Sequence, residues 1–584
     1  MSMPEYVLSF KPTTRGFGEH DPSAVLFKDG TLVFGIEEER LSRNKHAVNE
    51  FPIRAIRECL SVADIDFSDV DRIVLPYRPE LVSKLVYNNV VGTIRNPSLL
   101  ADSESGDPGS ESGISLLAKT LNTYALAKRG KLSAIVRYRL EQEFDSSCPP
   151  IETKEHHRCH AASAFHPTDF SEALVVTVDG RGEYDSTVIW RGDESGLTRL
   201  RTYPHPNSLG HFYAVVTEYL GYRAFNGEGK VMGLAPYGED NSRIETKLRN
   251  IIDVGVDYDV TALTTGGIEA GVRRLESLFD RPRNDDKGEF DDWQQDLAFT
   301  VQKLTEETVV DIVQEYSAVG SGNVGLSGGV ALNCKMNKRV MELDEVEQLF
   351  IQPVAHDGGL AVGAGLIDQQ PEAVPAMSNA YLGSEFEEAE IKRILEKNKI
   401  DYEEPDDLES TIAEYIANGE LIGWFQGRLE MGPRALGNRS ILADPRTEES
   451  RDRVNKFVKH REEWRPFAPS MIEAAAEDYL VNAEPSPYMI KTFEVLSDKT
   501  DEITAVLHPG DDTTRPQTVR EEQNPRYYRL IREFERRTGV PVLLNTSFND
   551  HGEPVVRTPT EAIKDFYGMG LDVLVLNDYV VRKD

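Results

Sequence analysis

A histidine-rich stretch, residues 156–160 (HHRCH), holds three of the chain's 12 histidines. On a helix, the four-residue spacing of His156 and His160 places two imidazoles on one face, close enough together to chelate a metal ion. We predict that Asp357, at the end of an expected strand, supplies a third ligand. The alternative is a pair of capped or solvent-facing histidines. Cys159 points away from this face, and we interpret it as a packed thiol.

Glycine turns beside apolar stretches form a second group of candidate residues. Backbone N–H groups in such turns can approach phosphate, and a following helix N-terminus adds positive potential. Each turn alone is weak evidence, because glycine after a strand is usually only a turn. Together they predict a nucleotide site split between two lobes. The three turns are Asp179-Gly180, Gly328-Gly329, and the stretch with Gly16 and Gly18 that leads into His20-Asp21.

Cations concentrate in the C-terminal part of the chain, although the chain as a whole is acidic. Arginine matches phosphate or carboxylate groups with two hydrogen bonds and stays charged when desolvated. Local pairing with glutamates, for example within REEWR, is the alternative. We favour a pocket for anions. The residues that would form it are Arg434, Arg439, Lys459, Arg461 and Arg465, with Arg515 and Asn545 able to complete it.

The composition limits the partners of the protein. The 584 residues include 99 Asp and Glu against 65 Lys and Arg, so the formal net charge is −34. A field of this sign disfavours nucleic acid and anionic membrane surfaces. The acid excess with only 23 lysines also favours adaptation to a salty cytoplasm, the alternative being an ordinary acidic enzyme. Four cysteines without a CxxC pair, and no apolar run near 18 residues, lead us to expect a cytoplasmic protein without a membrane span.

Apolar patterning predicts the elements that position these residues. Asp29-Gly30 between two apolar runs predicts a hairpin turn. A second meander starts about 150 residues after the first, which is weak evidence for an internal duplication and favours a two-lobed α/β fold. The expected strands of the two meanders are residues 5–10, 24–28 and 31–36, then 173–179 and 186–190.

A second α/β domain is expected in the C-terminal part. Strand patterns there alternate with helical ones, after a polar, Pro-containing stretch without periodicity. We also predict that the acidic stretch 101–113 is a surface loop. The expected division is a first domain at 1–370, a linker at 371–380 and a further domain at 381–584.

Motifs along nearly the whole chain resemble the O-carbamoyltransferases of the nodulation-protein-U and cephem-carbamoyltransferase type, which also act on aminoglycosides. The resemblance implies an N-terminal two-lobed actin/hexokinase-like (ASKHA-type) domain and a C-terminal YrdC-like α/β domain. No counterpart is evident for residues 97–135. Among the matching segments are HHRCHAASAF, DGRGE, LSGGVALNCKMN, HDGGLAVGAGL, GPRALGNRSILADPR and REEWRPFAPS.

The same resemblance implies two reaction steps. Carbamoyl phosphate and ATP, with Mg²⁺, first give carbamoyl-adenylate and pyrophosphate in the C-terminal domain. The carbamoyl group then passes to a substrate hydroxyl in the N-terminal domain, where the family suggests iron(II) as the bound metal. A developing negative charge on the carbamoyl oxygen needs a metal or cation nearby.

Residue roles follow from the resemblance by position. Around the carbamoyl group it implies His20 and Lys45, and we take His20 first and Asp21 second as the base that deprotonates the acceptor hydroxyl. The remaining implied roles are metal binding by His156, His160 and Asp357; nucleotide binding by Asp179, Gly180, Gly328, Gly329 and Asn333; and binding of carbamoyl phosphate and ATP by Arg434, Arg439, Lys459, Arg465, Arg515 and Asn545.

Two other functions compete with this interpretation. A tRNA threonylcarbamoyltransferase-like enzyme shares the N-terminal motifs but needs a basic face for RNA, which a chain of charge −34 disfavours. A non-catalytic nucleotide-binding regulator has no reason to keep both the metal and the anion constellations. The sequence does not identify the acceptor, for which we prefer a sugar or secondary-metabolite hydroxyl, and it does not predict an oligomeric state.

Overall fold

The computed structural model describes residues 4–13, 18, 20–81, 131–285, 288–367, 376–462 and 464–583. Its contacts divide the chain into two compact units, the first being Met1–Val33 with Asn49–Ala376 and the second Phe34–Val48 with Met377–Asp584. Residues 34–48 thus group with the C-terminal part of the chain. The domain boundaries predicted from sequence otherwise stay a prediction. The expected surface loop 101–113, most of the 97–135 segment and residues 371–375 of the expected linker lie outside the described residues.

The first unit contains two sheets with the same strand order. Within the described residues, one sheet has the order β3-β2-β1-β4-β5 and the other β8-β7-β6-β9-β10. In both, the central strand pairs antiparallel on one side and parallel on the other. This repeat supports the internal duplication and confirms the two-lobed α/β class. The strands are β1 (Tyr6–Phe10), β2 (Ser23–Lys28), β3 (Thr31–Glu37), β4 (Arg72–Leu75), β5 (Ile151–Thr153), β6 (Ala173–Val178), β7 (Asp185–Asp193), β8 (Gly196–Pro204), β9 (Asn323–Ser327) and β10 (Gln348–Ile351).

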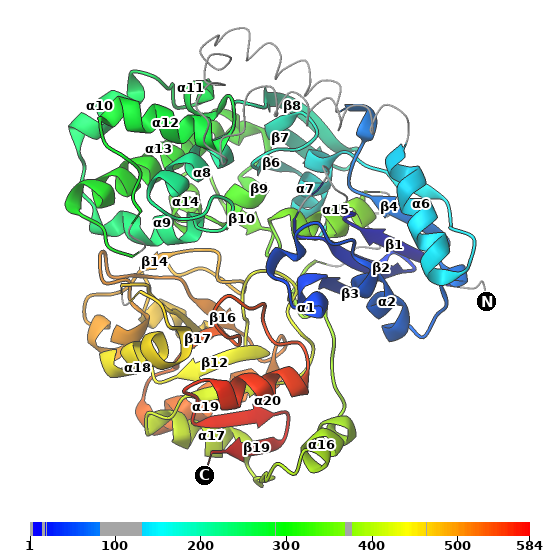
Figure 1. Cartoon of the computed structure of the whole chain (residues 1–584). Helices are drawn as coiled ribbons and strands as arrows, with labels where there is room; N and C mark the ends of the chain where they lie inside the picture. The colour runs from blue at the N-terminus through cyan, green and yellow to red at the C-terminus, as the bar shows by residue number, and fades with distance from the viewer. Residues whose placement is uncertain are drawn as a thin grey trace. The chain divides into compact units, whose positions relative to one another are not determined.

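Two helices pack against each other between these sheets: α7 (His156–Phe165) and α15 (Leu360–Leu366). Figure 1 shows them side by side. The small residues of α15 permit the close approach, because a Cβ on Gly363 would overlap the carbonyl oxygen of Cys159. The other side of α7 joins a core with Val175 and Trp190 of its sheet. The sequence therefore fixes α7, and the histidines on it, between two buried surfaces.

Further helices of the first unit pack partly on its sheets and partly on one another. The longest described one, α13 (Asp292–Tyr316), starts with a capping box between Asp291 and Gln294. Among the described helices, none combines the length and the apolar character that crossing a bilayer requires. The other helices are α2 (Ile53–Val62), α6 (Lys131–Phe144), α8 (Leu209–Tyr219), α9 (Glu228–Leu234), α10 (Ser242–Arg249), α11 (Thr261–Thr264), α12 (Ile268–Phe279) and α14 (Cys334–Met341).

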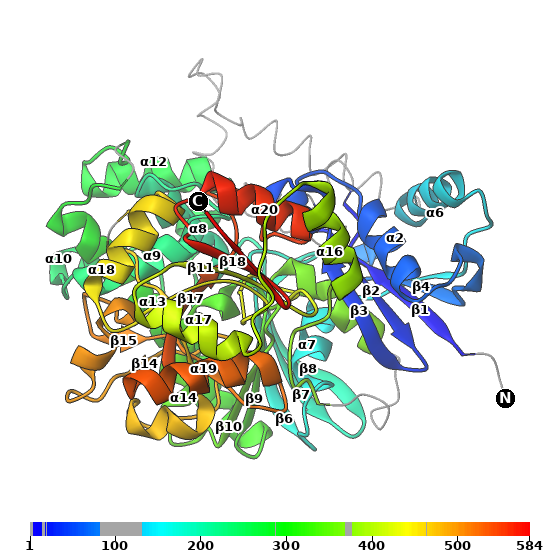
Figure 2. The same ribbon diagram turned by 90° about the horizontal axis from the view of Figure 1, so that it is seen from below.

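The second unit is built on a mixed sheet, so the C-terminal part is α/β as predicted; its likeness to YrdC stays a prediction. Within the described residues its strand order is β16-β13-β17-β12-β11-β18-β19. Figure 2 shows α20 on one side of this sheet and α17 and α19 on the other. The strands are β11 (Ile422–Phe425), β12 (Arg439–Ala443), β13 (Ala468–Ile472), β16 (Gln517–Val519), β17 (Val542–Ser547), β18 (Val573–Leu576) and β19 (Tyr579–Arg582), beside the pair β14 (Phe493–Glu494) and β15 (Thr513–Thr514).

The helices of the second unit begin and end at recognisable residues. In α19, Asn524 is the N-cap, Pro525 the first helical residue, and Gly539 ends the helix with a φ of +80°. These signals fix the helix that precedes β17. The helices of this unit are α1 (Glu39–Ser42), α16 (Glu388–Lys397), α17 (Leu408–Ala417), α18 (Glu448–Arg453), α19 (Pro525–Thr538) and α20 (Pro559–Gly568).

Candidate functional site

Two histidines and two carboxylates meet in the first unit. His156 and His160 lie one turn apart on α7. Asp179 directly follows β6, and Asp357 lies a few residues beyond β10 of the same sheet. One ligand atom from each of the four residues lies within 4.8 Å of the others. The structure thus brings the three predicted metal ligands together and adds Asp179 to them.

The spacing of these atoms fits a divalent metal ion. His156 Nε2 lies 3.2 Å from Asp179 Oδ2, and both His156 Nε2 and His160 Nε2 lie 3.7 Å from Asp357 Oδ1. Two ligands each about 2.1 Å from one ion stand roughly 3–4 Å apart. His160 Nδ1 hydrogen-bonds to Ser327 Oγ, which orients the ring, while its buried Nε2 makes no hydrogen bond within the described residues. That nitrogen is therefore available to a metal.

The charges of this cluster also favour a cation. Burial lowers the pKa of His156, but the carboxylates of Asp357 and Asp179 outweigh burial and raise it to about 9. Burial lowers the pKa of His160, which keeps that imidazole in the neutral form that binds metals. Burial alone would raise the pKa of Asp357, but Lys11, with Nζ 3.0 Å from Asp357 Oδ2, and His156 hold it well below its usual range.

His20 and Asp21 form a hydrogen-bonded pair. His20 Nδ1 lies 2.8 Å from Asp21 Oδ2, and the His20 side chain is 47 % exposed. Lys11 Nζ donates a hydrogen bond to the main-chain oxygen of His20 as well as pairing with Asp357. One buried lysine therefore connects this turn to the candidate metal site formed by His156, His160, Asp179 and Asp357. Lys45, predicted to act beside His20, belongs to the second unit.

The two glycine turns predicted to hold a nucleotide meet at neighbouring strand ends. Asp179 Oδ1 accepts a hydrogen bond of 2.9 Å from the Gly329 N–H. Gly328 has a φ of +94°, and a Cβ there would overlap the carbonyl oxygen of Val178. Because β6 and β9 are adjacent and parallel, the turn at Gly180 and the turn at Gly328 share one edge of the sheet. This edge is where open α/β sheets bind ligands.

Sequence reasoning assigned Asp179 only to the nucleotide and missed its place beside the histidines. The usable signal was its position at a strand end. β6, β9 and β10 are parallel neighbours, so Asp179 and Asp357 had to emerge at the same edge of the sheet. Lys11 gave no signal, because nothing in its local sequence marks a buried ion pair across the fold.

In the second unit, positive charge surrounds a buried lysine. Lys459 Nζ donates to the carbonyl oxygens of Ser547, at 2.6 Å, and Asn549, at 3.2 Å, and to Asn549 Oδ1 at 3.0 Å. Burial, followed by the charges of Arg461 and Lys45, holds the pKa of Lys459 well below its usual range. The neutral donors and acceptors around Lys459 thus position it without cancelling its charge.

Three arginines complete this cation cluster. The Arg461 guanidinium lies 4.2 Å from the centre of the Phe467 ring, and its Nε donates to Asn455 Oδ1 at 2.7 Å. Burial and the neighbouring Arg465 hold the pKa of Arg461 well below its usual range, and Arg515 adds to the effect. Cations this close repel one another in a low-dielectric interior. Arg465 pairs with Glu462 at 3.7 Å, the local pairing that was the alternative for REEWR, so one carboxylate lies beside these cations. The cluster of Lys45, Lys459, Arg461, Arg465 and Arg515 nevertheless holds more cations than this carboxylate can balance, which suits an anionic ligand.

Arg434 lies half-buried in the loop between Glu430 and Arg439. The next residue, Ala435, accepts a hydrogen bond of 3.2 Å from Asn545 Nδ2. Asn545 and Ser547 are two residues apart on β17 and so lie on the same face of the strand. Lys459 Nζ also donates to Ser547 Oγ at 3.4 Å, so the loop and Lys459 contact side chains on the same face of β17.

Three residues predicted to bind ligand use their polar groups within the fold. Arg439 is fully buried; its guanidinium donates to main-chain oxygens and lies 3.6 Å from the centre of the Phe425 ring. Asn545 supports Ala435, as described. Asn333 is the N-cap of α14, and its Oδ1 accepts a backbone N–H of the first helical turn. Their contact with substrate stays a prediction.

Two family models match most of the chain. Residues 15–366 match the family described as Carbamoyltransferase N-terminus, and residues 413–583 match Carbamoyltransferase C-terminus. Such a chain is a group-transfer enzyme. It belongs to the carbamoyltransferase family, as the resemblance of its motifs implied.

Similar proteins span most of the chain. Nodulation protein NolNO of Sinorhizobium fredii (strain NBRC 101917 / NGR234) is 35% identical over 97% of this chain and 79% of its own length. Nodulation protein U of Rhizobium tropici is 25% identical over 91% of this chain and 90% of its own. An uncharacterized protein of Synechocystis sp., sll1178, is 35% identical over 97% of this chain and 95% of its own.

Solved structures resemble the chain only distantly. The HypF protein of T. kodakarensis is 14% identical, with 64% of this chain and 51% of that chain covered and a TM-score of 0.31. The ROK hexokinase of Thermus thermophilus is 17% identical, with 62% and 98% covered and a TM-score of 0.26. Similarity at this level says nothing about activity.

Proposed function

We propose that the protein is an ATP-dependent O-carbamoyltransferase. Water cleaves carbamoyl phosphate to carbamate and phosphate, and a carbamate oxygen then attacks the α-phosphorus of ATP, releasing pyrophosphate and leaving carbamoyl-adenylate. An acceptor hydroxyl attacks the carbamoyl carbon of that anhydride, the bond to the AMP oxygen breaks, and the hydroxyl proton goes to a base. The acceptor is a sugar, glycan or secondary-metabolite hydroxyl.

The observation that carries this proposal is the cation cluster around Lys459. Anhydride formation gathers carbamate, phosphate and triphosphate oxygens in one place, and several fixed cations compensate their charge. Arg461 and Arg465 each lie close enough to shift the pKa of a neighbouring cation. With Arg434 on the adjoining loop, they are the residues that we propose bind carbamoyl phosphate and ATP with its Mg²⁺.

The four-residue cluster of the first unit supports the transfer step. We propose that His156, His160 and Asp357 hold a divalent metal, iron(II), with Asp179 beside them. When bound, the metal supplies positive charge for the oxygen of the carbamoyl group. The Asp179 contact with Gly329 supports a cradle for the adenylate at the same edge.

In this proposal, His20 accepts the proton of the acceptor hydroxyl. Its ring is exposed enough for an acceptor to reach, and Asp21 fixes its orientation through Nδ1. A base that is oriented by a carboxylate, with its other nitrogen toward solvent, is suited to general-base catalysis. This geometry favours Asp21 as the orienting residue and His20 as the base.

The two steps are proposed to separate by unit, and single substitutions test this. His156→Ala should abolish metal binding and acceptor carbamoylation while ATP–pyrophosphate exchange that depends on carbamoyl phosphate persists. Arg434→Ala should slow that exchange about a hundredfold, since it deletes a cation that holds a transferring anion, a loss of about 3 kcal/mol in transition-state stabilisation. Synthetic carbamoyl-adenylate should then restore acceptor carbamoylation.

Matched controls separate these effects from damage to the fold. His166→Ala alters the residue that ends α7, outside the metal cluster, and Arg451→Ala removes an arginine paired locally with Glu448 and Asp452. Both should behave as wild type. Absence of any carbamoyl-phosphate-dependent exchange in the wild-type protein would reject the ATP-dependent mechanism and favour a regulator.

A further inference from the structure

The loop that carries Arg434 is held from inside by one carboxylate. Glu430 Oε1 accepts three backbone N–H groups of this loop, those of Leu436 at 2.7 Å, Asn438 at 2.8 Å and Arg439 at 3.2 Å. These N–H groups could otherwise form an anion-binding nest. Because Glu430 occupies them, the loop offers a ligand its side chains, and the placement of Arg434 depends on how the loop is anchored.

The second anchor comes from about 390 residues earlier in the chain. Gly432 donates its N–H to Glu37 Oε1 at 2.6 Å, and its carbonyl oxygen accepts from Arg40 Nη2 at 2.7 Å. Both backbone groups of one residue are thus fixed, and that residue has a φ of +111°, which favours glycine. Arg40 is buried and also pairs with Glu39 at 3.1 Å. Only Pro433 lies between this anchor and Arg434.

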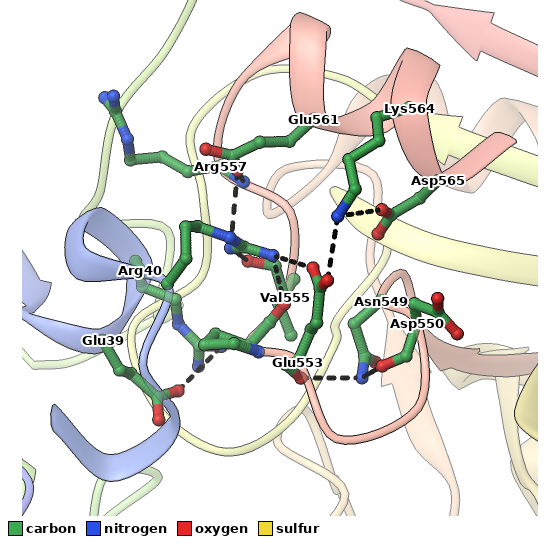
Figure 3. A network of polar contacts seen from close by, with 12 residues as sticks. Glu39, Arg40, Asn549, Asp550, Glu553, Val555, Arg557, Glu561, Lys564 and Asp565 are labelled. Atoms are coloured by element: carbon green, nitrogen blue, oxygen red, sulfur yellow. Dashed lines mark hydrogen bonds and ion pairs between the residues drawn. The ribbon is translucent and has the colours of Figure 1, made fainter. Parts of the chain in front are cut away.

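A third contact ties the same early segment to the loop that holds Lys459. Arg43 donates to the carbonyl oxygens of Pro554 and Val555, both at 2.7 Å, and lies 3.3 Å from Glu553. Figure 3 shows Glu553 and Val555 beside the helix with Glu39 and Arg40. Asn549, at the start of this loop, both contacts Lys459 and donates to the carbonyl oxygen of Glu553.

We propose that residues 34–48, here called the strap, position the anion-binding loops of the second unit, with Arg40 as the positioning residue for Arg434. The inference rests on the proposed role of the cation cluster. The strap contacts the two loops that supply Arg434 and support Lys459, and Lys45 adds its own charge to the cluster. The anhydride-forming step therefore requires residues encoded in the N-terminal part of the chain.

Arg40 acts through Arg434 in this proposal, so substitutions at the two positions should be non-additive. In the full-length protein, Arg40→Met should raise the KM for carbamoyl phosphate in pyrophosphate exchange at least tenfold and leave acceptor carbamoylation from synthetic carbamoyl-adenylate intact. Arg40→Lys keeps one donor for the Gly432 carbonyl and should recover part of this loss. In an Arg434→Ala background, Arg40→Met should change the exchange rate less than twofold.

Arg453→Met is the matched control. Arg453 also donates to a main-chain oxygen, that of Gly419, and pairs with a carboxylate, Asp572, in the same unit, but it touches neither Gly432 nor Asn549. It should leave the KM unchanged. Equal effects of Arg40→Met with and without Arg434 would make Arg40 merely structural and overturn the inference. If Arg434→Ala alone fails to impair exchange, the proposed role of the cation cluster is refuted instead.

Discussion

Replacing Glu37 by glutamine should stabilise the protein, and more so at alkaline pH. Burial raises the pKa of Glu37 from 4.5 to about 7, although Arg40 opposes the shift. A carboxyl whose pKa rises on folding binds protons more readily in the folded state, so its charged form lowers the free energy of unfolding as pH rises from about 4.5 through about 7. The penalty is about 1 kcal/mol at pH 5.5 and about 3 kcal/mol at pH 8.5.

Glutamine removes this penalty and keeps a carbonyl oxygen for the Gly432 N–H. The assay is urea unfolding of the wild type and Glu37→Gln at both pH values. Comparing the two proteins at each pH cancels the titration of every other group, so the advantage of the variant should grow by about 2 kcal/mol between pH 5.5 and 8.5. A constant advantage would show that Glu37 titrates alike in the folded and unfolded states, and an advantage that shrinks as pH rises would show that folding lowers its pKa. Either result would refute the reasoning.

Two further predictions concern packing and net charge. Gly363→Ala should cost about 1–3 kcal/mol of stability and weaken metal binding, because the new Cβ displaces the Cys159 carbonyl between the two histidines of α7. The control is Gly229→Ala in α9, where a Cβ would meet no atom within 4 Å. Unchanged metal stoichiometry and affinity in Gly363→Ala would contradict the argument. The melting temperature without substrate should rise between dilute buffer and molar KCl. The reason is that salt shortens the Debye length from about 10 Å at 0.1 M to about 3 Å at 1 M and so screens the self-repulsion of a chain of charge −34. A melting temperature that stays constant or falls would refute adaptation to a salty cytoplasm and favour an ordinary acidic enzyme.

Much of the metal cluster could be predicted because local patterns carry it. The i, i+4 spacing of His156 and His160 needs only a helix, and an aspartate at a strand end needs only a sheet edge. Turn chemistry was equally local: Asp29 and Gly30 take φ values of 50° and 81°, the hairpin geometry that this dipeptide favours. Such features depend on neighbours within a few residues, and the sequence displays them directly.

The contacts of the strap, residues 34–48, could not be predicted from local sequence patterns. Nothing near Arg40 or Glu37 marks a partner such as Gly432, because the contacts are to main-chain atoms, and any residue type supplies those. Arg439 shows the same limit: an arginine in a cationic cluster looks like an anion ligand, yet its guanidinium donates to backbone carbonyls. Residue type and spacing therefore predict side-chain clusters far better than they predict contacts between side chains and the main chain.

The two candidate sites differ in the sign of their charge, and this difference fits a reaction in two steps. In the first unit, Asp179 and Asp357 face imidazoles and one buried lysine, an environment that favours a cation. In the second, burial and then the charges of neighbouring cations lower the pKa of Lys459, an environment that favours anions. The proposed anhydride formation needs fixed cations beside the carbamate and phosphate oxygens, whereas the proposed transfer needs acidic ligands that hold a metal ion for the carbamoyl oxygen. A chain that met both demands in one site would place the metal ligands beside the arginines, where each would neutralise the other.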